Sequence, residues 1–271
     1  MQLTKACPFR FRTRVAGTLT LALVLGGCAS TSMKSMTTGA AASGTVASET
    51  TGANVRRVGF LTDYARLKPL PGGGGILCWR TAGVDWKQYN KVLFERIQVY
   101  LKPGSSQSID PTDLKMLIDY FHSDLVKAIR PSATVVNKPG PGVLRVRIAL
   151  TELVPTNTEA SLAGTAVPYG FVAEIGSGAA DGKPAGSTPY LGQTGIEVQF
   201  RDGGSGQLLA ECADREIGLK YAADLNSGTV NAAENWMNGY VDSFTQWDYA
   251  KTAFDKWSAE FARRLAALKA G

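Results

Sequence analysis

Alternating hydrophobic and polar positions predict strands in the second half of the chain. Residues 143–150 alternate strictly, with four aliphatic side chains on one face and two arginines on the other, as in a half-buried strand. Residues 196–200 and 208–213 alternate in the same way on either side of a glycine-rich turn, and they are expected to form a hairpin. Residues 91–101 carry β-branched and aromatic side chains on both faces, which predicts one centrally placed strand.

Hydrophobic side chains spaced three and four residues apart predict two long helices. The first begins at Pro111, with Asp110 as its N-cap, and stops before Pro131. The second runs from about Trp247 to Leu268. It carries an aromatic stripe that we interpret as the inner face of a core helix, with a partner groove or ligand cavity as the alternative. The stripe consists of Trp247, Phe254, Trp257 and Phe261.

The order of these elements predicts the fold class. A strand, a helix, further strands, a hairpin and a final helix favour an α+β two-layer sandwich, with a mainly antiparallel sheet of about four or five strands and two main helices on one face. The stretch before residue 91 is aromatic but irregular, and we expect an extended arm draped over the domain. Its segment Phe60–Tyr64 is interpreted as part of this arm, with a recognition peptide as the alternative. The Gly-rich segment 155–194 is either functional or disordered.

The first 28 residues have the layout of a bacterial lipoprotein signal. Four basic residues precede an apolar run of about ten residues, which is too short to span a bilayer. The run ends in Leu25-Gly26-Gly27-Cys28, which resembles a lipobox. Proteins with this signal are cut before the cysteine, whose thiol then receives diacylglycerol and whose new amine receives a fatty acid such as palmitate. We therefore predict a signal peptide over 1–27 and lipidation of Cys28.

The residues after the signal predict a tether and a location. Residues 28–57 are rich in Ala, Ser, Thr and Gly, which predicts a flexible tether ahead of a single domain over 58–271. Ala29 and Ser30 follow the cysteine, and in families with this signal the lack of an adjacent aspartate implies transport to the outer membrane. The expected partner is thus the membrane itself, bound through the N-terminal lipid on the periplasmic side, with envelope proteins as further candidates.

Removing the signal changes the charge of the chain. The 271 residues contain 29 Lys and Arg against 23 Asp and Glu, and four of the basic residues lie in the signal. The remaining 25 basic and 23 acidic residues give the mature chain a net charge of +2. The pI near 9.1 is therefore largely a property of the signal, and no nucleic-acid partner is expected.

Two cysteines remain in the mature domain. Cys7 leaves with the signal and Cys28 carries lipid, which leaves Cys78 and Cys212. In an oxidising periplasm they either form a disulfide or stay as two separate buried thiols. Because the chain has no CxxC motif, neither a redox pair nor a cysteine zinc site is indicated.

A search for catalytic chemistry finds no site. His122 is the chain's single histidine, which excludes an HExxH metal site, and its place beside a helix core stripe predicts a half-exposed structural role. Ser205 lacks the GxSxG context of a nucleophile elbow and belongs to the predicted turn. Residues 176–183 resemble a P-loop, but their glycine and hydroxyl positions do not fit the motif.

Acidic residues on or near the strands are the remaining candidates for acid–base chemistry. We expect them at the surface, because ionised carboxylates are rarely buried without partners. They are Glu152, Glu197, Glu211, Asp214 and Glu216. The sequence therefore predicts no enzyme, no metal and no cofactor.

Several short motifs resemble one family of proteobacterial lipoproteins. They are Gly59–Leu67, Trp86-x-x-Tyr89, the hairpin Asp202–Leu209 ahead of Asp214-Arg215, and the aromatic pattern Trp247–Ser258. On these residues the chain is identified as a member of an uncharacterised family, the domain of unknown function thirty-three thirteen, over about residues 58–267. The resemblance implies an envelope location and an α/β sandwich. It supplies no catalytic residues.

Two functions compete on this evidence. The first is a non-catalytic structural or interaction module of the envelope, which predicts an exposed apolar or sheet-edge patch. The second is a periplasmic binding or sensor domain for a small apolar or cell-wall ligand, held between the helix layer and the Gly-rich segment. It predicts an enclosed apolar pocket of a few hundred Å³ lined by Trp or Phe. An enzyme ranks third and needs titratable groups that converge in a cleft.

Overall fold

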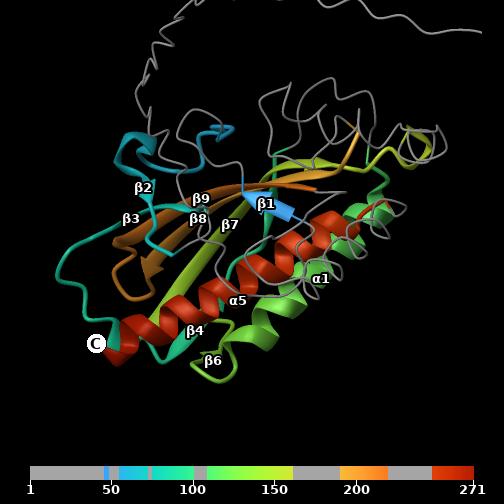
Figure 1. Cartoon of the computed structure of the whole chain (residues 1–271). Coiled ribbons are helices and arrows are strands. Elements are labelled where there is room, and N and C mark those ends of the chain that lie inside the picture. The colour runs from blue at the N-terminus through green and yellow to red at the C-terminus, as the bar shows by residue number, and fades with distance from the viewer. Residues whose placement is uncertain (1–45, 49–54, 73–74, 101–108, 161–189, 219–245) are drawn as a thin grey trace, which may run out of the picture. The chain divides into compact units, whose positions relative to one another are not determined.

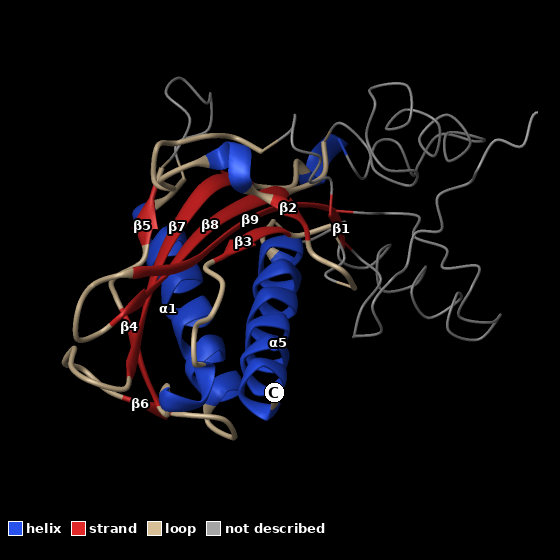
Figure 2. Cartoon of the chain, turned by 90° about the vertical axis from the view of Figure 1, so that its left-hand side faces the viewer, coloured by secondary structure: helices blue, strands red, loops and turns tan. Residues whose placement is uncertain are grey.

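The computed structural model describes residues 46–48, 55–72, 75–100, 109–160, 190–218 and 246–271, all within one compact unit. They form an α+β fold in which one mixed sheet carries two long helices on one face (Figures 1 and 2). The class is the predicted one. The predicted signal peptide, Cys28, the P-loop-like stretch and most of the Gly-rich segment lie outside the described residues.

The sheet is larger than predicted. Within the described residues it has nine strands in the order β2-β3-β9-β8-β7-β4-β6, with β1 paired to β9 and β5 to β7. Their bounds are β1 Val46–Ser48, β2 Lys68–Pro69, β3 Leu77–Arg80, β4 Lys91–Phe94, β5 Gln98–Val99, β6 Thr134–Val135, β7 Val143–Val154, β8 Gln193–Asp202 and β9 Leu208–Gly218. The estimate of about four or five strands is wrong, because the additional strands are too short to show an alternating pattern. Strand β1 lies within the stretch predicted as a tether.

The centre of the sheet is the predicted antiparallel set β7-β8-β9, but its neighbours run parallel. Strands β4 and β5 both pair with β7 in parallel, and Glu95–Ile97 separate them, so the predicted single strand over 91–101 is split. Parallel neighbours need a long crossover. Helix α1, Pro111–Ile129, provides it between β4 and β7.

The two long helices begin and end close to the predicted residues. The Asp110 side chain accepts a hydrogen bond from the Thr112 backbone N–H at 2.7 Å, which caps α1. Helix α5 spans Asp248–Ala270. The stacked rings of Phe121 and Phe254, 4.5 Å between centroids, join the two helices. Residues 158–160 are also helical, and 3-10 turns at Tyr64–Arg66 and Trp86–Gln88 add to the two helices predicted.

The sheet is covered on both faces. Alternate residues of β7 (Leu144, Val146, Ile148 and Leu150) face the helices as predicted and belong to the main core. On the other face, Phe60 and Leu61 of the arm, defined here as residues 55–67, pack with Ala149 and Ala213. The arm therefore lies on its own domain, and these two side chains are buried instead of being presented to a partner.

Cys78 and Cys212 form a disulfide between neighbouring strands. Their Cα atoms are 4.1 Å apart in the β3–β9 register, although the two residues are separated by 134 positions in sequence. Of the two arrangements left open by the sequence, the structure has the paired one. The bond therefore links β3 covalently to β9, one of the three central strands.

Buried polar contacts attach α5 to β9. The Trp257 Nε1–H donates to Asp214 Oδ2 at 2.8 Å, and Lys256 forms an ion pair with Glu216. Burial, together with the neighbouring charge of Asp214, raises the pKa of Glu216 well above its usual value. Burial opposes the charged form of Lys256, but attraction to Glu216 and Asp214 outweighs it and raises the pKa of Lys256.

Replacing both disulfide cysteines with alanine is expected to lower the free energy of unfolding by about 4 kcal/mol, because the bond closes a very long loop in the unfolded chain. Urea unfolding of the oxidised protein and of the Cys78→Ala/Cys212→Ala variant measures this difference. The reduced wild type serves as a second reference. A loss below about 1 kcal/mol would contradict a structural role for the bond.

Replacing Glu216 with glutamine is expected to flatten the pH dependence of stability. Since the folded pKa of Glu216 is raised, its contribution is full below the unfolded pKa near 4.5 and falls as pH rises through the folded value. The wild type should therefore lose stability relative to Glu216→Gln as pH increases above about 4.5. Urea unfolding at several pH values measures the difference, with exposed Glu159→Gln as control. Parallel curves for wild type and Glu216→Gln would refute it.

Candidate functional site

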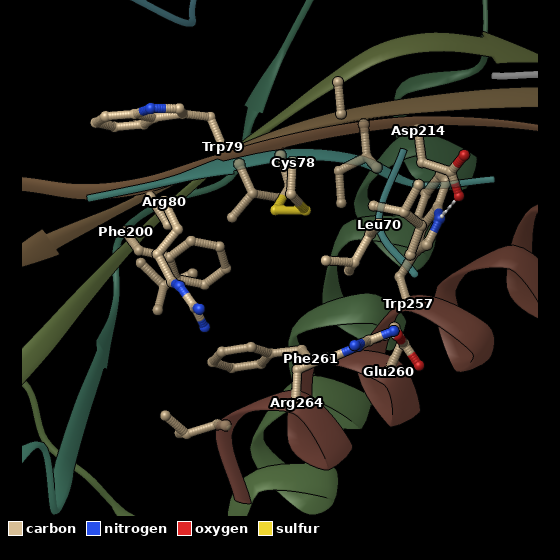
Figure 3. Close-up of a pocket in the computed structure, with 18 of the residues that line it drawn as sticks. Leu70, Cys78, Trp79, Arg80, Phe200, Asp214, Trp257, Glu260, Phe261 and Arg264 are labelled. Carbon is tan, nitrogen blue, oxygen red and sulfur yellow. Dashed lines mark hydrogen bonds and ion pairs between the residues drawn. A yellow bond between two sulfur atoms is a disulfide. The ribbon is translucent and has the colours of Figure 1, made fainter. Parts of the chain in front are cut away.

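An apolar cavity of about 670 Å³ lies between the sheet and helix α5 (Figure 3). Its volume falls within the range of small-molecule sites in proteins. Alternate residues of the central strands form one wall, and the inward faces of α5 and α1 form the other. The principal lining residues are Leu144, Val146, Ile148, Ile196, Val198, Phe200, Ala210 and Cys212 from the sheet, and Phe121, Leu125, Trp257, Phe261 and Leu265 from the helices.

The lining residues show that the cavity is open to solvent. Val198, Phe200 and Cys212 point toward the helices, yet each is only partly buried. Close packing would bury side chains in such central positions. Phe261 of α5 stacks on Phe200, with 5.5 Å between ring centroids, and is also partly exposed. The sheet and α5 therefore touch through aromatic rings at one end and leave a gap beside them.

Small side chains on β9 explain this gap. Ala210 and Cys212 occupy the two β9 positions that face α5 next to the aromatic residues, and Cys212 is drawn toward β3 by its disulfide. On the helix side, Trp257 is held by its hydrogen bond to Asp214. The hollow therefore lies beside a point at which α5 is fastened to the sheet.

Charged side chains lie at the mouth of the cavity. Arg264 donates a hydrogen bond from Nε to the Glu260 carboxylate and another from Nη2 to the Pro71 carbonyl, the latter at 2.6 Å. Figure 3 shows Arg80 beside Phe200, at the side of the cavity away from Asp214. Lys68 and Arg80 are exposed, and within the described part of the chain neither forms an ion pair. The rim is therefore cationic and the interior apolar.

The five acidic candidates lie in different places from those predicted. The expectation that they would be at the surface is wrong, because all five are buried, none being more than 8% exposed. Asp214 and Glu216 face α5 and hold it to the sheet. Glu152 pairs with Arg215 at 2.7 Å. The sequence could not show the non-local donors that make this burial tolerable.

Glu197 and Glu211 hold the arm on the outer face of the sheet. Glu211 accepts from the Thr62 backbone N–H at 2.6 Å, and Glu197 accepts from the Tyr64 hydroxyl at 2.9 Å. Burial raises the pKa of Glu197, although hydrogen bonds from the Tyr64 hydroxyl and from backbone N–H groups of the arm oppose the shift. Burial and the contact with Glu197 also raise the pKa of Tyr64. These carboxylates have a structural role and face away from the cavity.

The other candidates do not assemble a catalytic site. His122 is exposed on α1, with its ring 6.1 Å from that of Phe94. Ser205 sits in the β8–β9 turn, where Asp202 accepts its backbone N–H at 2.6 Å, as a turn serine should. Among the described residues, no group of three or more His, Cys, Asp or Glu side chains could hold a metal ion. Nor does any described helix have the length and hydropathy to cross a bilayer.

The sequence alone did not reveal the rim of the cavity. Strand β3 falls in a stretch expected to be irregular, so Arg80 is not among the residues predicted to be functional. The spacing of two residues could have indicated it: Cys78 and Arg80 are two positions apart and therefore share one face of an extended segment. Once Cys78 is bonded to Cys212, that face is directed toward α5.

Sequence comparison finds relatives of the chain. The uncharacterized lipoprotein YdcL of Escherichia coli strain K12 is 28% identical over 116 residues, which make up 42% of this chain and 52% of that protein. The YdcL of E. coli O157:H7 matches to the same extent. The match thus spans about half the length of the curated relatives.

Structure comparison finds distant likenesses. The PelC dodecamer of Paraburkholderia phytofirmans is 11% identical with a TM-score of 0.29, over 62% of this chain and 98% of that chain. The hypothetical protein CT253 of Chlamydia trachomatis is 11% identical with a TM-score of 0.32, over 67% and 99%. The family of proteins of unknown function DUF3313, in contrast, matches residues 56–242, which is well over half of the chain. The chain therefore belongs to the DUF3313 family.

Proposed function

We propose that this protein is a lipid-anchored envelope protein whose domain binds an apolar ligand in the cavity between the sheet and α5. The cavity is the observation that carries the proposal. It has the volume of a ligand site, its walls are aliphatic and aromatic, and it is accessible from solvent. It lies against the sheet, whereas the sequence placed a pocket against the Gly-rich segment.

The anchor rests on the N-terminal sequence. The lipobox-like Leu25-Gly26-Gly27-Cys28 follows a short apolar run, and the curated relatives are named lipoproteins. Cys28 would carry the lipid, and Ala29 and Ser30 favour the outer membrane with the domain in the periplasm. The domain acts there without catalysis, as a carrier or sensor.

Ligand binding fits the domain better than a purely structural module. A module needs an exposed apolar or sheet-edge patch, but the large hydrophobic side chains exposed among the described residues are Met116 and Val154, on different elements. The strands at the two ends of the path, β2 and β6, are each two residues long and offer little edge for pairing. The apolar surface available for recognition is inside the cavity.

Burial of an apolar chain supplies much of the binding free energy but not all of it. Burying one methylene contributes about 0.8 kcal/mol, so a tail of about ten methylenes gains roughly 8 kcal/mol before the cost of association is subtracted. Because micromolar affinity corresponds to about 8 kcal/mol after that subtraction, such a ligand needs further contacts to reach it. A ligand of this kind is also available to a protein held at a lipid surface.

Substituting Cys28 is expected to release the protein from the membrane. Full-length Cys28→Ser should carry no lipid, and it should be found in the soluble fraction or as the uncleaved precursor. Wild type should need detergent for extraction from the membrane, because several acyl chains make attachment effectively permanent. Fractionation followed by intact-mass measurement tests this. Cys7→Ser, within the same signal, is the matched control and should behave as wild type. An unmodified wild-type mass would contradict the anchor.

Filling the cavity is expected to abolish apolar ligand binding. In Val198→Trp the indole would occupy the space beside Phe200, so the affinity for N-phenyl-1-naphthylamine should fall at least about tenfold. Val154→Trp makes the same change at an exposed position outside the cavity and should bind as wild type does. Fluorescence titration of the two folded variants measures the affinity. Equal affinity in both variants, or no binding by wild type, would overturn the proposed site.

A further inference from the structure

We infer that the cavity binds a single-chain amphiphile with an anionic headgroup, and that Arg80 at its mouth holds the headgroup. This inference rests on the proposed function and specifies its ligand class. It combines two features of the same site: an apolar interior that accepts a tail, and a cationic rim that accepts a negative charge.

The interior offers no attraction for a charged group. The polar side chain in its wall is Asp214, whose carboxylate already accepts from the Trp257 indole at 2.8 Å. An anionic headgroup placed there would be repelled by this carboxylate and would lose its water. The headgroup must therefore remain at the opposite side, where Figure 3 shows Arg80.

The rim has an excess of positive charge. Glu260 and Arg264 both line the cavity and form an ion pair, so their charges cancel. Lys68 and Arg80 leave two positive charges at the rim, and no described carboxylate is paired with either. The rim thus complements an anion and disfavours a cation.

Arg80 is the residue best placed to bind the headgroup. It is the last residue of β3, and the β3–β9 register sets it opposite Ala210, which lines the cavity. The backbone just beyond it is fixed, because the Thr81 N–H donates to the Leu209 carbonyl at 2.8 Å. A guanidinium on a fixed strand end can bind a carboxylate or a phosphate through two parallel hydrogen bonds. Arg264 is less available, since it already bonds Glu260 and Pro71.

The test compares three amphiphiles that share a twelve-carbon chain. Dodecanoate, dodecyl maltoside and dodecyltrimethylammonium are used below their critical micelle concentrations to displace N-phenyl-1-naphthylamine from the folded wild-type domain. Dodecanoate should bind about tenfold tighter than the maltoside, because a charge-assisted hydrogen bond is added, and the cationic amphiphile should bind weakest. Arg80→Gln should remove the preference for dodecanoate.

Arg96→Gln is the matched control, because Arg96 is exposed and does not line the cavity. It should keep the wild-type preference. If dodecanoate and dodecyl maltoside bind equally, or if Arg80→Gln keeps the preference, the headgroup inference is overturned while the cavity remains a ligand site. If the naphthylamine probe itself does not bind, or binds Val198→Trp unchanged, the proposed function fails instead. If dodecanoate is preferred as expected, comparing its affinity with that of dodecyl phosphate shows whether the wild type favours a carboxylate or a phosphate headgroup.

Discussion

The fold depends on satisfying two carboxylates that are fully buried on the outer face of the sheet. Glu197 and Glu211 lie on neighbouring strands with no exposed surface. A buried charge without partners costs several kcal/mol, so these positions require donors from another segment. The arm supplies them through the Thr62 backbone and the Tyr64 hydroxyl. Its course over the sheet is thus set by charge satisfaction as much as by the burial of Phe60 and Leu61.

The position of the arm determines where the next two strands lie. Strands β2 and β3 come directly after the arm, and β3 adds to the sheet beside β9. This placement brings Cys78 within bonding distance of Cys212 and carries Arg80 to the mouth of the cavity on the opposite face. The outer-face carboxylates and the cavity rim are therefore connected through the chain, although they lie on different faces of the same sheet.

Elements with long periodic patterns could be predicted from the sequence. Features that depend on contacts between residues far apart in the sequence could not. Helix α1 starts at its proline and is capped by Asp110 because those signals are local. The parallel pairing of β4 and β5 with β7 was not predicted, and the apolar side chains on both faces of 91–101 did not reveal the break at Glu95–Ile97. The burial of Glu211 depends on Thr62, 149 residues away, and no local pattern records that contact. For the same reason the sequence identified the aromatic stripe of α5 but not the empty space beside Trp257 and Phe261.

The cavity itself is the strongest argument that the domain binds something. Protein cores are normally close-packed, and an unfilled space lowers stability because its lining atoms lose contacts. The chain could have filled this space with larger side chains at Ala210 or Val198, which face it directly. Instead, the small side chain of Ala210 leaves the space open, while buried polar contacts beside it fasten α5 to β9. A space left unfilled at a cost in stability is typical of a binding site, where the ligand supplies the missing contacts.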